Sequence, residues 1–335
     1  MGNQKRHKGP AIVALGGGHG LSAILRGLKF YTDDLTAIVT VADDGGGSGV
    51  LREDLGMPPP GDIRNCMEAL ADTESLMQQL LAYRFPDGRL AGQAFGNLLL
   101  AALDGISPSF DQAVARMSEV LAITGRILPV TNADVQLEAS FENGSSVCGE
   151  SKISAAKKEQ NCRIHHVRLL PEHTPALPAA LDAIRRAEVI LLGPGSLYTS
   201  VIPNLLVDGV SEAIADSSAL KIYVCNIMTQ DGETEGMTAQ DHLAALLEHG
   251  GPGLVDLCLC NSDPVSPELL ARYSAEDAEP VVPMEVNRRE VELLGAEVVY
   301  RPLMDMDCGY ARHSGVKVAQ AVVDLYQQRA DTKIF

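Results

Sequence analysis

Short apolar runs alternate with longer segments of helical periodicity along most of this chain. The strand-like runs lie at 11–15, 35–41, 189–192, 221–225, 255–260 and 297–300. Helical periodicity covers 21–29, 62–71, 74–84, 95–122, 177–187, 207–215, 238–249, 267–273 and 314–328. Near-continuous apolar strands between helices are typical of parallel sheets that are buried on both faces. The pattern therefore predicts an α/β fold whose parallel sheet is covered by helices on both faces.

The alternation is interrupted between residues 127 and 170. Short alternating pieces there surround Asn143-Gly144, a dipeptide typical of tight hairpin turns. We expect a small antiparallel β insertion at about 127–170, after a helical segment at about 62–122. Both belong to a single domain over 10–330, while the polar and basic residues 1–9 are expected to form a disordered tail.

The segment 41–66, VADDGGGSGVLREDLGMPPPGDIRNC, combines adjacent carboxylates with many glycines and three consecutive prolines. Glycine frees φ and proline fixes it, so the composition predicts a long loop without regular structure. Long structured loops are usually functional, and we interpret this one as gripping a ligand. Asp62, just before Ile63, has the position of an N-cap for the helix that follows.

The chain has 335 residues, 46% of them hydrophobic, and a formal net charge of −17. An acidic chain repels polyanions, so we expect no nucleic-acid partner. No apolar run approaches the ~20 residues of a membrane span, which predicts no membrane insertion and a cytoplasmic location.

Seven cysteines occur without any Cys-x-x-Cys pair. Cys225, Cys258 and Cys260 lie in apolar, strand-like runs, where we expect them to behave as small hydrophobes. This usage fits a reducing compartment.

Small or polar residues follow each predicted strand, at the edge where parallel sheets bind ligands. The first strand ends in Gly16-Gly17-Gly18-His19-Gly20 and the second in Asp43-Asp44. Later strands are followed by Gly195-Ser196, Asn226 and Asn261.

The segment from Gly18 to Ala23 fits G-x-G-x-x-A, in which glycines let the backbone approach a pyrophosphate at a helix N-terminus. Asp43 follows about 20 residues later, where an acid accepts from ribose hydroxyls. The alternative is a plain tight turn with close helix packing. His19 is either a phosphate donor or a structural residue.

Asp43 and Asp44 have three interpretations: contacts to a ribose or base, Mg²⁺ binding together with a substrate phosphate, or capping of the next turn. Gly195 and Ser196 form either a second anion cradle or an ordinary strand-to-helix turn. The sequence has no G-x-S-x-G, P-loop or H-E-x-x-H motif, and we assign no catalytic residue.

Five segments resemble the YvcK family, also called gluconeogenesis factors, over about 10–317. They are ALGGGHGLSAILRGLK, TAIVTVADDGGGSGVLREDLGMPPPGDIRNC, AFGNLLLAAL, GPGSLYTSVIPNLL and VCNIMTQDGETEGMTAQDH. The resemblance implies a Rossmann-like fold shared with 2-phospho-L-lactate transferase. It also implies a cytoplasmic bacterial protein needed for cell shape and peptidoglycan synthesis during gluconeogenic growth. Such proteins bind UDP-sugars, and no reaction is firmly attached to them.

Carried over by position, the resemblance implies a ligand site with the diphosphate at Gly16 to Gly20 and the nucleoside or a metal at Asp43 and Asp44. Further ligand-binding residues implied in this way are Gly46, Ser48, Asn97, Gly195, Ser196, Asn226, Tyr273 and Arg312. An aromatic face stacks on a uracil or sugar, and a guanidinium pairs with phosphate.

Three hypotheses follow. The first is a regulatory protein that binds UDP-N-acetylglucosamine or UDP-glucose, requires no cofactor and links carbon metabolism to cell-wall synthesis through protein partners. The alternative is a Mg²⁺-dependent transferase of the 2-phospho-L-lactate transferase type, with Asp43 or Asp44 holding the metal. A third is an NAD-binding oxidoreductase. In each case we expect a homodimer.

Overall fold

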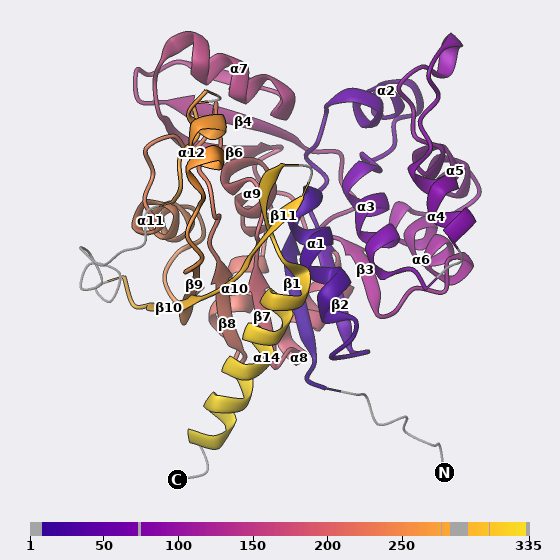
Figure 1. Ribbon diagram of the computed structural model, residues 1–335. Coiled ribbons are helices and arrows are strands. Elements are labelled where there is room, and N and C mark those ends of the chain that lie inside the picture. Colours follow the sequence, from indigo (N-terminus) through magenta and orange to yellow (C-terminus); the bar gives the residue numbers. More distant parts are fainter. Residues whose placement is uncertain (1–8, 73–74, 276, 282–293, 308, 333–335) are drawn as a thin grey trace, which may run out of the picture.

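The computed structural model describes residues 9–72, 75–275, 277–281, 294–307 and 309–332 (Figure 1). Its centre is a seven-stranded sheet in the order β10-β9-β8-β7-β1-β2-β3, with parallel pairing throughout. The strands are β1 (Ile12–Gly16), β2 (Leu35–Val39), β3 (Arg126–Pro129), β7 (Val189–Leu192), β8 (Leu220–Val224), β9 (Leu257–Asn261) and β10 (Glu297–Arg301). The predicted parallel α/β sheet is confirmed.

Helices cover both faces of this sheet. Every residue of β1, β2, β7 and β8 is buried, as expected for strands with apolar side chains on both faces. On one face α1 (Gly18–Leu28) packs against α3 (Gly61–Leu70) and α14 (Gly315–Thr332). The other face carries α8 (Pro178–Arg186), α9 (Ile202–Leu205), α10 (Val210–Ala215) and α11 (Ala239–Gly250).

The remaining helices lie beside these two layers (Figure 1). A predominantly helical segment contains α4 (Ser75–Ala82), η1 (Gly88–Leu90), α5 (Phe95–Gly105) and α6 (Phe110–Val120). The C-terminal half of the chain also contains η2 (Leu197–Val201), α12 (Pro267–Ser274) and the hairpin of β11 (Met304–Asp307) and β12 (Tyr310–His313). The predicted tail falls almost entirely outside the described residues. Within those residues, no helix has both the length and the apolar character needed to cross a bilayer.

The insertion is a three-stranded antiparallel sheet in the order β5-β4-β6. Its elements are β4 (Gln136–Phe141), β5 (Ser146–Cys148), β6 (Ile164–Leu170) and the intervening α7 (Glu150–Gln160). Gly144 turns the β4–β5 hairpin with φ 84°, as the Asn-Gly signal predicted. The boundary differs from the expected one, because residues 126–129 join the main sheet beside β2. The weakly amphipathic α7 was not predicted.

The segment 41–66 is only partly irregular, which corrects the prediction of one long loop. Helix α2 (Gly46–Leu55) occupies its middle and ends at Gly56, whose φ of 67° is left-handed. Glycines inside a helix lower its stability but do not forbid it, and Val50 to Leu55 supplies ordinary helix formers. In Figure 1, α2 stands above the carboxyl ends of the strands on one side, and α7 with β4 on the other.

Candidate functional site

The sheet reverses its strand order at β1. From β1 the chain builds β2 and β3 on one side, and β7 to β10 on the other. In open parallel sheets a ligand binds outside the carboxyl ends of the strands at such a switch point. The segments that meet there are the β1–α1 turn, the residues after β2 and the residues after β7.

The β1–α1 turn brings backbone amides to this point. Helix α1 begins at Gly18, directly after β1, and Gly17 precedes it in an extended conformation. A side chain at Gly20 would collide with the carbonyl oxygen of Pro194, so a glycine is needed for the close approach of α1 to the residues after β7. The first amides of a helix are free to bind an anion. The geometry therefore retains both of the proposed roles, phosphate cradle and tight packing.

Asp62 lies against the same turn. A Cβ atom at Gly17 would lie 2.5 Å from Asp62 Oδ2, and the carboxylate accepts a hydrogen bond from the Gly18 amide. Burial, and then the charge of Asp43, raise the pKa of Asp62 to about 6. The prediction that Asp62 caps its own helix is wrong. Pro60 holds the N-cap position of α3, and the Asp62 carboxylate accepts from the first amide of α1 instead.

Carboxylates gather on the side of the site next to β2. Asp43 accepts from the Gly45 amide at 2.9 Å and from the buried Ser48 hydroxyl. Burial is the main cause that raises its pKa. Asp44 accepts from the Ser151 amide at 2.8 Å, which ties the segment after β2 to the first turn of α7. Gly46 lies at the exposed start of α2.

Glu150 and Glu233 complete this acidic group, although the sequence interpretation did not single them out. Burial, and then the charge of Asp43, raise the pKa of Glu150 to about 7, while a hydrogen bond from Thr199 opposes the shift. Glu233 is 4% exposed and accepts from the Tyr198 amide at 2.6 Å and from the Ser196 hydroxyl. Burial also raises its pKa. Glu150 has no local sequence signal, whereas Glu233 lies within the resembling segment after β8.

Positive charge gathers near His19 at the start of α1. Burial, and then the guanidinium groups of Arg312, Arg64 and Arg26, lower the pKa of His19. Arg312 is exposed on β12, with its guanidinium carbon 5.5 Å from the centre of the Tyr310 ring. His19 and Arg312, both expected from the sequence to bind the ligand, lie at the same end of α1.

Asn97 supports this positive side from α5. Its side chain is 2% exposed and accepts from Nε of Arg64 at 3.0 Å. Arg64 is itself buried and also pairs with Glu68. Asn97 thus orients the side chain of Arg64. The resemblance had implied that Asn97 contacts the ligand itself.

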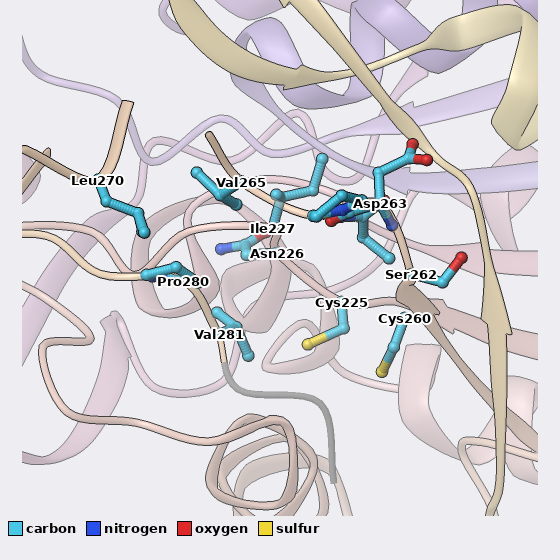
Figure 2. Close-up of a pocket in the computed structure, with 12 residues that line it drawn as sticks. Cys225, Asn226, Ile227, Cys260, Ser262, Asp263, Val265, Leu270, Pro280 and Val281 are labelled. Carbon is cyan, nitrogen blue, oxygen red and sulfur yellow. The ribbon is translucent and has the colours of Figure 1, made fainter. Parts of the chain in front are cut away.

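Tyr273 and Asn226 lie farther along the sheet. The Tyr273 ring is buried in a small cluster, and its hydroxyl donates to the carbonyl of Ala311 at 3.2 Å and accepts from the Ala311 amide at 3.0 Å. These two hydrogen bonds fix Ala311 in β12, the residue next to Arg312. Asn226 follows β8 and lines a separate cavity at the ends of β8 and β9 (Figure 2).

A metal at Asp43 would need further ligands. Among the described residues, the group of three ligand atoms within 4.8 Å of one another consists of the sulfurs of Cys225, Cys258 and Cys260, not of carboxylates. Mg²⁺ is usually held by one or two carboxylates together with substrate phosphates. Asp43 lies near enough to Glu150 for its charge to raise the pKa of Glu150.

The family of 2-phospho-L-lactate transferase CofD matches residues 12–304. The chain is 46% identical to the gluconeogenesis factor of Bacillus subtilis over 320 residues, which cover 95% of this chain and 99% of the relative. It is 46% identical to the gluconeogenesis factor of Halalkalibacterium halodurans over 93% of this chain and 95% of the relative. A crystal structure of a UPF0052 family protein from Bacillus halodurans superposes with a TM-score of 0.89 at 45% identity, covering 94% of this chain and 99% of that one.

Proposed function

This chain belongs to the CofD family, together with the gluconeogenesis factors, and from that premise we propose that it binds a UDP-sugar at the switch point as a regulatory ligand. In this proposal the occupied protein connects carbon metabolism to cell-wall synthesis and cell shape. UDP-N-acetylglucosamine and UDP-glucose are the ligands to test first.

The observation that carries the proposal is the meeting of cationic and acidic groups around the β1–α1 turn. The guanidinium groups of Arg312 and Arg64 act on His19 at the N-terminus of α1. A helix N-terminus with arginines fits the two phosphates of a nucleotide diphosphate, and because the Gly18 amide already donates to Asp62, the phosphates would meet the amides that follow it. Asp43 and Glu150 offer acceptors to hydroxyl groups. A UDP-sugar carries both kinds of group.

The same contacts support a regulatory role. Asp44 joins the segment after β2 to α7, and Glu150 at the start of α7 accepts from Thr199 after β7. A ligand that replaces these contacts changes how the insertion sits on the sheet edge. Cell-wall or carbon-metabolism proteins would then distinguish the occupied surface from the free one.

Isothermal titration calorimetry tests this proposal with UDP-N-acetylglucosamine, UDP-glucose and NAD, each with and without Mg²⁺. Each mixture is analysed for products afterwards. We expect saturable binding of a UDP-sugar that stays intact, weakened in Asp43→Ala and in Arg312→Ala. An exposed control, Arg186→Ala on α8, should bind as the wild type does. Absence of UDP-sugar binding to the folded protein contradicts the proposal.

A Mg²⁺-dependent transferase is the second candidate, and the raised pKa values of Asp43 and Glu150 favour it. Burial and the charges of neighbouring carboxylates raise both pKa values, and Mg²⁺ would add positive charge there while it neutralises a diphosphate leaving group. This candidate predicts release of a nucleoside monophosphate from a nucleotide-linked donor only when Mg²⁺ is present. Binding that is independent of Mg²⁺, with no product, counts against it.

A further inference from the structure

Three buried cysteines on adjacent strands converge beneath the cavity at the ends of β8 and β9. Cys225 directly follows β8, and its amide donates to the carbonyl of Leu259 at 3.0 Å. This places Cys225 beside Cys260, while Cys258 lies two residues earlier on the same face of β9. The three sulfur atoms all lie within 4.8 Å of one another. Figure 2 shows the sulfurs of Cys225 and Cys260 both turned away from Asp263.

The spacing of the sulfurs matches that of thiolates around one metal ion. The Cys258 and Cys260 sulfurs are 3.8 Å apart. Two thiolates at Zn–S bonds of about 2.3 Å in a tetrahedron are separated by roughly the same distance, ~3.8 Å. This spacing is too long for a disulfide, whose sulfurs are about 2.05 Å apart.

A histidine with a free ring nitrogen lies close to these thiols. The fully buried His242 donates from Nδ1 to the carbonyl oxygen of Thr238 at 2.8 Å, and no hydrogen-bond partner is found for its Nε2 within the described part of the chain. Metal-bound histidines usually donate their other ring nitrogen to a carbonyl or a carboxylate in this way. His242 lies near enough to Cys260 for the charges of the two groups to act on each other. It is not part of the group whose ligand atoms lie within 4.8 Å of one another, so its ring would have to move toward the sulfurs to become a fourth ligand.

We propose that Cys225, Cys258 and Cys260 form a binding site for Zn²⁺, with His242 or a water molecule from the adjoining cavity in the fourth position. Soft thiolates select Zn²⁺ and monovalent copper. Three thiolates leave a net charge of −1 with Zn²⁺ but −2 with monovalent copper, and the smaller buried charge costs less. The three cysteines are buried in the main hydrophobic core, as expected for small hydrophobes. The proposed metal site gives them a second role, which no local sequence pattern signals because the thiols come from two strands.

The cavity gives the ion a route of entry. It has a volume of about 260 Å³, and Cys225, Cys260, Asn226 and Asp263 are among the residues that line it. Zn²⁺ binds cysteine as the thiolate, so metal binding should release protons and affinity should increase with pH.

The test uses the full chain, reduced and stripped of metal, titrated first with Co²⁺ as a spectroscopic probe and then with Zn²⁺. We expect one ion per chain, a thiolate-to-Co²⁺ charge-transfer band with the intense visible bands of tetrahedral Co²⁺, and bleaching of both by Zn²⁺. Cys260→Ser and Cys258→Ala should lose these bands. Cys148→Ser, which removes a half-exposed thiol on β5, should keep them.

A measurement on the wild type protects the test against variants that fail to fold. Zn²⁺ should raise the thermal unfolding midpoint of the wild type, and a chelator should reverse the rise. His242→Ala separates the two choices for the fourth ligand, because only a bound His242 makes its loss weaken Zn²⁺ binding. The site is disproved if the wild type shows no thiolate-to-Co²⁺ band, or if folded Cys260→Ser keeps the band unchanged.

Discussion

The carboxylate of Asp62, in the first turn of α3, accepts a hydrogen bond from the amide of Gly18, the first residue of α1. A negative charge at a helix N-terminus is favourable, but this one is buried and close to Asp43. Burial prevails, since the pKa of Asp62 is raised to about 6. Asp62 therefore holds its proton more tightly in the folded chain than in the unfolded chain.

The first prediction concerns the pH dependence of stability. An acid whose folded pKa is raised stabilises the fold fully below its unfolded value of 3.8, and that stability is lost as the pH rises through about 6. A pKa raised from 3.8 to about 6 corresponds to roughly 3 kcal/mol over the whole titration. Asp62→Asn keeps an acceptor for the Gly18 amide but carries no charge. Because pH 4 already lies above the unfolded pKa, the free energy of unfolding of Asp62→Asn relative to the wild type should rise by about 2 kcal/mol between pH 4 and pH 7.

Urea denaturation at the two pH values measures this difference. Asp87→Asn, at an exposed position before η1, is the control and should show no pH-dependent difference from the wild type. If Asp62→Asn changes the unfolding free energy equally at both pH values, the carboxylate is not a source of this pH dependence.

The second prediction tests the positive charge near the start of α1. After burial, the charge of Arg312 is the largest cause that lowers the pKa of His19. Removing this guanidinium in Arg312→Ala favours the protonated imidazole, so the pKa of His19 should rise. Titration of the His19 ring signals by NMR measures the shift. Arg186→Ala should leave the pKa of His19 where it is in the wild type, and an unchanged value in Arg312→Ala would place Arg312 away from the site.

Periodicity and strand-end chemistry were sufficient to predict the sheet and the place of two turns at its edge. Apolar runs predict β1, β2 and β7, and because Gly17 and Asp43 follow parallel strands, they are expected at one edge of the sheet. Arg312 was implied only by the family resemblance. Its nearness to His19 depends on the hairpin of β11 and β12, which has no strong local signal.

The parts that sequence could not predict depend on contacts between distant segments. Glu150 meets Asp43 because α7 lies over the sheet edge, and no local pattern encodes that meeting. Asp62 has the sequence position of an N-cap, yet its carboxylate binds the amide of another helix. Local patterns show which groups a residue can bind, whereas the tertiary fold decides which of them are within reach.

The third prediction concerns the segment after β7. Glu233 accepts from the buried Tyr198 amide, from the Ser196 hydroxyl and from the Thr199 amide. Glu233→Ala leaves these donors without their acceptor, which costs about 1–3 kcal/mol for a buried donor. Urea denaturation should show this loss, and hydrogen exchange should be faster at Tyr198 and Thr199. Glu159→Ala, on the exposed side of α7, should alter neither. A stable variant with protected amides would mean that Glu233 does not anchor this segment.

The last prediction concerns the close approach of α1 to the residues after β7. A methyl group at Gly20 would overlap the carbonyl oxygen of Pro194 and lie 3.0 Å from the Cα atom of Gly195. The overlapping atoms belong to the backbone of α1 and of the segment after β7, so neither can move without shifting its whole segment. Gly20→Ala should therefore lower the free energy of unfolding by about 1–3 kcal/mol. Because the same shift displaces the first amides of α1, it should also weaken binding of the UDP-sugar proposed above.

Gly105→Ala is the matched control: it lies at the end of α5 with no atom near the added methyl group, and alanine is the better helix former. Urea unfolding and calorimetric titration of both variants separate the effect of steric overlap at Gly20 from the effect of replacing a helical glycine with alanine. Equal behaviour of the two variants would show that α1 has room at Gly20, and the phosphate cradle would then not depend on this contact.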